Sequence, residues 1–326
     1  MHTMGAEVRT TGKSPEPSDT MWPTILIIIY CLLVAAASFL GGMLPSLLRL
    51  THTRMQLVMS FVGGLVLGVA LLHMLPHSAV ETGSLDQTAM SALVGLLTMF
   101  LLIRAFQVHQ HGPVEEASVC RHEPAEQPCA HHDHDHSHDP TEGECCDTHR
   151  HPYSWIGLYA GLSLHTLIDG MALAASVSAQ RHAGEPGLPL LGLGTFLAVA
   201  LHKPLDAMSI TSVMATGGWS SQARRVVNVL FALMCAVGAI CFYLGVQQLA
   251  ETQRLVIGTS LGFAAGVFLC ISLADILPEV HFHTHDRFKL SAALLLGVAL
   301  AYAIGFAEPG HKHGHEPAAT EVHETE

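Results

Sequence analysis

The stretch Leu164-His165-Thr166-Leu167-Ile168-Asp169-Gly170 lies in the middle of an apolar run, residues 153–179. A second apolar run, residues 188–215, carries Leu201-His202-Lys203-Pro204-Leu205-Asp206 at its centre. Each run is long enough to span a bilayer, which takes about 20 residues in a helix. Each run therefore places one His and one Asp, four positions apart, near the middle of a membrane.

These two His/Asp pairs predict one shared polar site. Positions i and i+4 lie on the same face of a helix, so two such helices facing each other bring both pairs to one point. Ionisable groups at that depth are costly unless they are paired, hydrated or metal-bound. Imidazole with carboxylate suits a divalent ion such as zinc. Two satisfied buried His/Asp hydrogen bonds are the alternative interpretation.

The composition indicates an integral membrane protein. The chain has 326 residues, of which 50% are hydrophobic and 13% charged, whereas soluble domains carry about 25% charged residues. The net charge of -12 does not indicate nucleic-acid binding, which requires a basic face.

Eight apolar runs predict an all-α integral membrane protein with eight transmembrane helices. The runs are residues 22–48, 56–76, 89–108, 153–179, 188–215, 224–249, 255–280 and 288–306. The predicted organisation is an N-terminal tail (1–21), helices 1–3 (22–108), a His/Cys-rich loop (109–152), helices 4–8 (153–306) and a His-containing tail (307–326).

The basic residues in the loops predict the orientation. One side holds Arg49, Arg54, Arg104, Arg121, Arg150, Arg224, Arg225, Arg287 and Lys289, and the other holds Arg9, Lys13, Arg181, Arg254 and Lys312. Because Lys and Arg collect on the cytoplasmic side, both termini are expected outside and the 109–152 loop inside. We therefore expect a multi-pass protein of the cell membrane.

The chain also contains an internal repeat. Placing residue 61 over residue 263 pairs Phe61 with Phe263, Gly64 with Gly266, Leu67 with Leu269, Leu71 with Leu273, Leu75 with Leu277 and Pro76 with Pro278. The second and seventh spans cross in opposite directions, so spans 1–3 and 6–8 are predicted to form an inverted repeat around spans 4 and 5. Such repeats around a midplane site are typical of transporters; chance similarity between apolar spans is the alternative.

Four motifs together resemble the ZIP family of zinc and iron importers. The family's fourth span carries His-Asn-x-x-Asp-Gly or a variant, as at His165, and its fifth carries His-Glu-x-Pro-His or a variant, as at His202. Residues 72–77 match the end of its second span, and residues 275–279 match its seventh-span motif. The resemblance covers residues 22–306. It implies eight spans, outside termini, a His-rich cytoplasmic loop and transport of a divalent metal, most simply zinc, into the cytoplasm by alternating access.

The resemblance also implies site residues. The transport site would be His165, Asp169, His202 and Asp206, and the pathway would include His73, His77, Asp275 and Glu279. Thr166 stands where Asn is usual, and Lys203 stands where a ligand to a second metal is common. A protonated Lys cannot bind metal. Lys203 is therefore expected to replace the second ion and to pair with Asp169 or Asp206.

A second metal-binding prediction concerns the loop of residues 109–152. Its candidate ligands are His131, His132, His134, His136, His138, Cys145 and Cys146. They could buffer or sense zinc, and a low-complexity segment that merely tolerates His is the alternative.

Other function classes fit less well. A cation-diffusion efflux transporter would be expected to have six spans and a soluble metal-binding domain. An intramembrane zinc hydrolase would be expected to show His-Glu-x-x-His or an acid/base Glu beside the paired His residues. A metal-sensing receptor is left open, as is oligomeric state, with a homodimer as the candidate assembly. The expected partners are the metal ion as substrate and the lipid bilayer; no cofactor is expected.

Overall fold

The computed structural model describes residues 17–47, 52–107, 154–182, 190–282 and 287–306, and in these ranges the chain is almost entirely helical. The elements are α1 (Pro17–Leu47), α2 (His52–Val69), η1 (Ala70–Met74), α3 (Leu75–Thr82), α4 (Leu85–Gln107), α5 (Ser154–His182), α6 (Leu193–Thr216), α7 (Ser221–Val246), α8 (Gln253–Phe282) and α9 (Arg287–Ile304). The His/Cys-rich loop, the C-terminal tail and residues 1–16 lie outside the described residues, as do the side chains of Asp275 and Glu279, whereas residues 17–21 of the predicted N-terminal tail begin α1.

The second apolar run continues past Pro76, where the sequence predicts its end. α2, η1 and α3 follow one another without a break, so the span reaches Thr82. Pro76 occupies the first turn of α3, where its missing N–H is tolerated. η1 is a π-helical turn immediately before it, and such turns rearrange the backbone hydrogen bonds. Gly83, at φ 65°, ends the helix instead.

Six of the described helical segments are long and apolar enough to cross a membrane: Met21–Leu44, Thr53–Thr82, Leu85–Ala105, Trp155–Arg181, Ser221–Val246 and Gln253–Ala274. α9 contributes a shorter apolar stretch, Phe288–Ile304. α6 has 24 residues and carries the polar residues of the fifth run. The expected total of eight spans therefore includes α6 and α9 beside the six.

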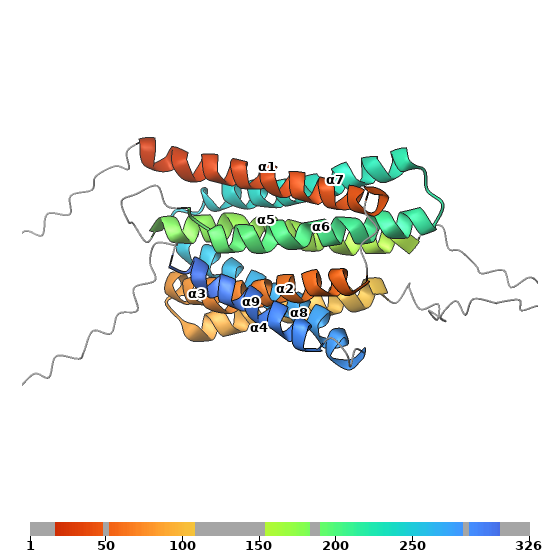
Figure 1. The fold of residues 1–326 in the computed structure, drawn as a ribbon. Coiled ribbons are helices and arrows are strands. Elements are labelled where there is room, and N and C mark those ends of the chain that lie inside the picture. Colours follow the sequence, from red (N-terminus) through yellow and green to blue (C-terminus); the bar gives the residue numbers. More distant parts are fainter. Residues whose placement is uncertain (1–16, 48–51, 108–153, 183–189, 283–286, 307–326) are drawn as a thin grey trace, which may run out of the picture.

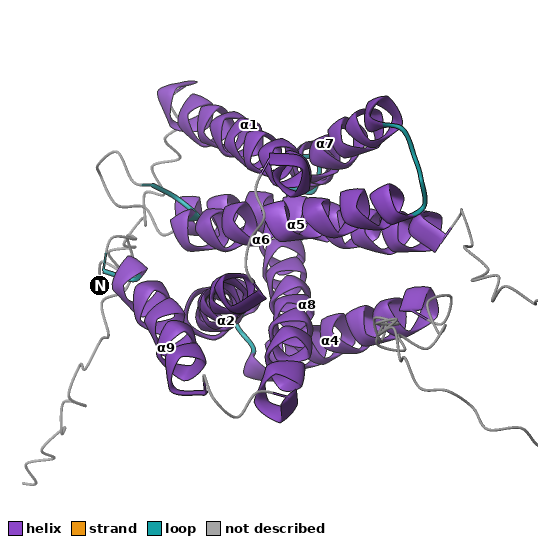
Figure 2. Ribbon diagram, turned by 45° about the vertical axis from the view of Figure 1, so that its right-hand side comes forward, coloured by secondary structure: helices purple, strands orange, loops and turns teal. Residues whose placement is uncertain are grey.

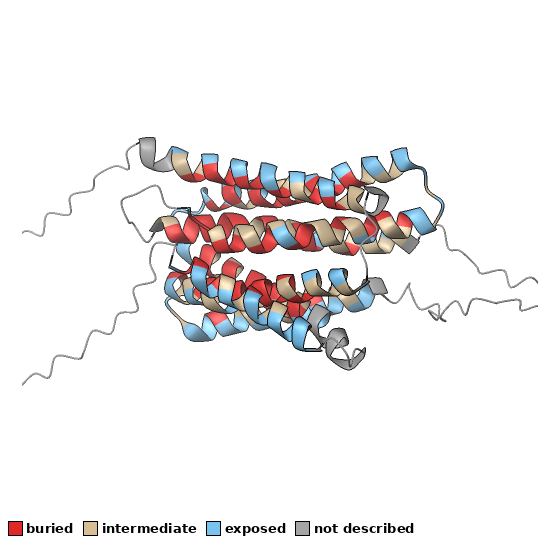
Figure 3. Cartoon of the chain, viewed as in Figure 1, coloured by how far each residue is buried: buried red, intermediate tan, exposed pale blue. Residues whose placement is uncertain are grey.

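The helices form two bundles that meet along α5, α6 and α8. α1, α5, α6 and α7 pack together, and α2, η1, α3, α4, α8 and α9 form the other bundle (Figures 1 and 2). Burial follows this arrangement: the inward faces are buried and the outward faces are exposed (Figure 3). Exposed apolar side chains on the outward faces include Leu32, Leu40, Leu97, Leu101, Leu233, Ile240, Leu295 and Leu296. Faces of this kind suit contact with lipid tails.

Close helix contacts at glycines follow the internal repeat. At four glycines an added Cβ would overlap a backbone carbonyl group of the neighbouring helix: Gly64 on Leu294, Gly266 on Ala92, Gly95 on Phe263 and Gly297 on Phe61. The register that pairs Phe61 with Phe263 also pairs Ala92 with Leu294 and Gly95 with Gly297. It therefore converts each α2–α9 contact into an α4–α8 contact. Shared three-dimensional contacts in one register support a true repeat over chance similarity.

These contacts lead to a stability prediction. Gly266→Ala should lower the melting temperature of the purified protein, because the methyl group meets the backbone of α4 and overpacking costs about 1–3 kcal/mol. Gly245→Ala on α7 is the matched control, since no neighbouring group among the described residues lies within 4 Å of the place that its methyl group would take. There the change should be neutral or slightly stabilising, because Ala favours helix over Gly. Equal melting temperatures for the two variants would contradict the close packing.

Candidate metal site

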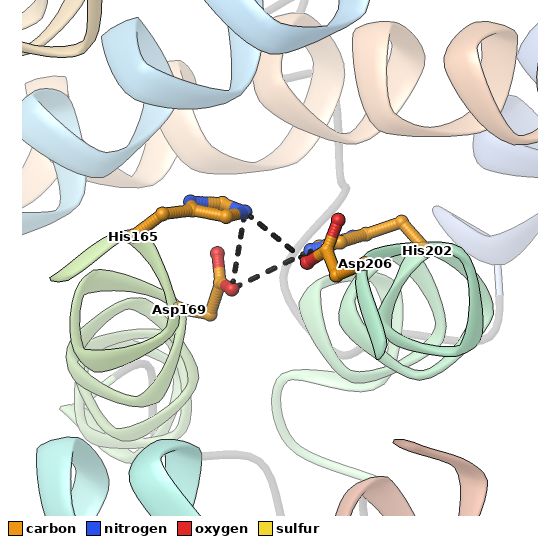
Figure 4. Close-up of side chains that lie close together, drawn as sticks. All are labelled: His165, Asp169, His202 and Asp206. Carbon is orange, nitrogen blue, oxygen red and sulfur yellow. Dashed lines mark hydrogen bonds and ion pairs between the residues drawn. The ribbon is translucent and has the colours of Figure 1, made fainter. Parts of the chain in front are cut away.

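The two central helices bring their paired residues together. α5 carries His165 and Asp169, α6 carries His202 and Asp206, and one ligand atom from each of the four lies within 4.8 Å of the others (Figure 4). Each His Nε2 faces the Oδ2 of both Asp side chains. His165 lies 3.4 Å from Asp169 and 3.8 Å from Asp206, and His202 lies 3.4 Å and 3.9 Å from the same two atoms.

These separations match the size of a four-coordinate zinc site. Zn–N and Zn–O bonds of about 2.0–2.1 Å place the ligand atoms of a tetrahedron about 3.3 Å apart. The four His-to-Asp distances, 3.4 to 3.9 Å, are at this value or slightly above it. A small inward movement of the side chains would complete the coordination, so the geometry suits an ion of this radius.

The hydrogen bonds of the imidazoles favour a cation between the four groups. His202 Nδ1 donates to the carbonyl oxygen of Ala198 at 2.8 Å, which leaves Nε2 of the neutral ring as an acceptor. That nitrogen faces the carboxylate of Asp169, which is also an acceptor. Among the described residues, both ring nitrogens of His165 and Oδ1 of Asp169 are buried without a hydrogen-bond partner. Buried polar atoms without a partner are costly, and a metal ion satisfies the carboxylate oxygen and the acceptor nitrogen of the neutral ring.

Lys203 lies directly beside this group. Its Nζ is 2.5 Å from Asp169 Oδ2 and 2.9 Å from Asp206 Oδ2, and it donates to Thr166 Oγ1 at 3.0 Å. Pairing with Asp169 or Asp206 was expected; the structure shows both at once. The Phe231 ring lies 5.6 Å from the ammonium group and is fully buried. The contact of Phe231 with Lys203 could not be predicted from the sequence, because Phe231 resembles any other apolar residue of the sixth run.

Glycines allow α5 to pack closely against α7. A Cβ on Gly170, next to Asp169, would overlap the carbonyl oxygen of Cys235, and one on Gly238 would overlap that of Leu167. The backbones of α5 and α7 therefore touch behind the site. This contact fixes the rotation of α5 that directs His165 and Asp169 toward α6.

The predicted pathway histidines of the second span lie outside the four-residue group. His73, in η1, is buried and donates through Nε2 to the carbonyl oxygen of Ala301 at 2.7 Å. His77, in α3, accepts from the Gln180 amide at 3.3 Å. Sequence reasoning missed Gln180, which is buried and also accepts from the N–H of Gly192 at 2.7 Å. Gln180 thus joins α5, α3 and the start of α6 at one end of the molecule.

The two ends of the central helices differ in packing. Toward Gln180, residues 172–175 of α5 are fully buried. Toward the start of α5, Ile156 and Leu164 are exposed. Within the site, the Asp206 side chain is 18% exposed, whereas those of His165, Asp169 and His202 are 2%, 0% and 8% exposed. The start of α5 therefore has one apolar face turned outward, while on its other face Trp155, Leu158, Tyr159 and Leu162 pack against the buried Ala207, Ile210, Met214 and Phe231.

Comparison with known proteins finds one matching family and several related zinc transporters. Residues 24–305 match the family described as ZIP zinc transporter. The chain is 23% identical to zinc transporter ZIP9 of Xenopus tropicalis over 88% of this chain and 98% of the relative. It is 24% identical to zinc transporter 3 of Oryza sativa subsp. japonica over 74% of this chain and 76% of the relative. It is 28% identical to ZIP9 of Macaca fascicularis over 47% of this chain and 67% of the relative.

Proposed function

The chain belongs to the ZIP zinc transporter family, and from this membership we propose that it carries zinc through the site formed by His165, Asp169, His202 and Asp206. The observation that supports this most directly is the set of four donor atoms within 4.8 Å of one another between two membrane helices, with His-to-Asp distances of 3.4 to 3.9 Å. Membership of a transporter family also agrees with the expectation that the chain is not an enzyme.

The charges of the site suit an ion that must leave again. Without metal, two carboxylates and one ammonium group sum to one negative charge. With zinc the sum becomes one positive charge, so the ion is attracted but not trapped. Lys203 thereby takes the place and the charge of a second metal, and the site carries one ion at a time.

The repeat contacts of the helices around α5 and α6 support transport by alternating access, because inverted repeats around a midplane site are typical of such transporters. The end at which α5 begins is the one that the basic residues predict to face the cytoplasm. Outward opening requires the two bundles to move apart on the Gln180 side, where the contact between Gln180 and His77 connects them. In this proposal the protein lies in the cell membrane with both termini outside.

Zinc accumulation in intact cells tests the function and its direction. Cells expressing the full chain should accumulate radioactive zinc from the medium several-fold faster than cells with an empty vector, because the proposed direction is inward. Lower accumulation than in the vector control would indicate efflux. Unchanged accumulation, with surface labelling confirming that the protein reaches the membrane, would refute transport.

A further inference from the structure

We propose that Thr166 is a positioning residue that keeps the third N–H of the Lys203 ammonium group away from the remaining unpaired ligand atoms of the site and so sets the affinity of the site for its ion. The inference rests on the proposed function, because it concerns the same site. It adds a role for a residue that is not itself a ligand.

The ammonium group of Lys203 has three N–H donors and finds three acceptors. Two are the Oδ2 atoms of Asp169 and Asp206, at 2.5 and 2.9 Å. The third is Thr166 Oγ1, at 3.0 Å. Lys203 is only 1% exposed, so water does not replace a lost acceptor. Thr166 is the one uncharged member of the three and the one that is not a proposed metal ligand.

Thr166 is oriented to accept. Its hydroxyl donates to the carbonyl oxygen of Leu162 on the preceding turn of α5 at 2.6 Å. The hydroxyl proton is therefore directed along the helix, and a lone pair faces Lys203. Thr166 is fully buried, which prevents the side chain from turning to solvent.

Removing this acceptor would redirect the third N–H of the ammonium group toward the atoms of the metal site that still lack a hydrogen-bond partner. A buried N–H without a partner is costly, and the buried acceptors without a hydrogen-bond partner in this site, among the described residues, are Asp169 Oδ1 and the one acceptor nitrogen of the neutral His165 ring. Both residues belong to the proposed ligand set. The ammonium group would then compete with zinc for them, and the apparent affinity should fall about tenfold, which corresponds to about 1.4 kcal/mol.

The experiment measures zinc uptake into proteoliposomes that contain the full-length protein. Thr166→Val is expected to raise KM about tenfold with little change in the maximal rate, and Thr166→Ser, which keeps the hydroxyl, should restore the wild-type KM. Thr166→Ala is a second variant with the same expected increase. Thr211→Val is the matched control, because the buried Thr211 hydroxyl likewise donates along its own helix, to Ala207 at 3.0 Å. Its KM should stay at the wild-type value.

A second background separates positioning from a general structural role. In protein that already carries Lys203→Met, adding Thr166→Val should leave KM unchanged, because no ammonium group remains to be held. An equal shift in both backgrounds, a wild-type KM for both Thr166→Val and Thr166→Ala, or failure of Thr166→Ser to restore KM would overturn the inference. Asp169→Ala separates a failure of the proposed site from a failure of the positioning role. If uptake survives Asp169→Ala, the proposed site is refuted. If Asp169→Ala abolishes uptake but Thr166→Val leaves uptake unaffected, only the positioning role is refuted.

Discussion

Alanine at His165, Asp169, His202 or Asp206 is expected to reduce zinc transport by more than about 100-fold, since the loss of even a supporting partner of a metal ligand costs about 10–100-fold. The four donor atoms lie within 4.8 Å of one another and each supplies one quarter of the proposed coordination. Removing one donor atom leaves a dehydrated zinc ion in the middle of the membrane with too few ligands.

The two histidine variants test the site with the least effect on the ion pairs of Lys203. His202→Ala leaves the contacts of Lys203 with Asp169 and Asp206 in place, whereas Asp169→Ala also removes one partner of a buried ammonium group. Breaking one half of a buried pair costs about 3–5 kcal/mol, so protein yield and melting temperature must accompany the uptake measurement for the aspartate variants.

A surface aspartate controls for the loss of a carboxylate as such. Asp86 lies exposed in the first turn of α4, and Asp86→Ala should leave uptake in proteoliposomes within about twofold of wild type, in keeping with the small effect of most surface substitutions. Normal uptake by any two of the four site variants would show that the metal does not pass through this group.

Changing Lys203 should alter both the number of ions bound and the strength of binding. Lys203→Met leaves two carboxylates without their positive partner, so the empty site carries two negative charges. An interaction between unit charges 4 Å apart is worth about 4 kcal/mol at an effective dielectric constant of 20. Zinc should therefore bind more tightly and leave more slowly, which lowers KM and the maximal rate together.

Lys203→Glu replaces the ammonium group by a third carboxylate. Metal analysis of the purified full-length variant should show one zinc ion more than wild type, and the difference cancels any sites in the loop and tails. Without zinc the three carboxylates repel one another, so the variant should melt lower than wild type and gain more from added zinc. An unchanged ion count with an unchanged response to zinc would mean that Lys203 does not stand in for a second metal.

Much of this protein follows from local sequence pattern. Apolar runs long enough to cross a bilayer predict the helices, and the four-residue spacing of His165 with Asp169 and of His202 with Asp206 places each pair on one face. Both depend only on helix geometry, which is the same in every helix. The register of the internal repeat could be predicted for a similar reason, because glycines that permit close helix contact recur at matching positions.

The tertiary structure decided what depends on neighbours far away in the chain. α3 continues beyond Pro76 because the π-helical turn before it accommodates the missing donor. Lys203 contacts Asp169 and Thr166 on another helix as well as Asp206 on its own. The sequence predicts a partner for Lys203 at Asp169 or Asp206, but only the tertiary structure shows that both carboxylates and the Thr166 hydroxyl contact it together. Those contacts are set by the packing of α5 against α6 and α7, where glycine contacts fix the distance between α5 and α7 and the rotation of α5.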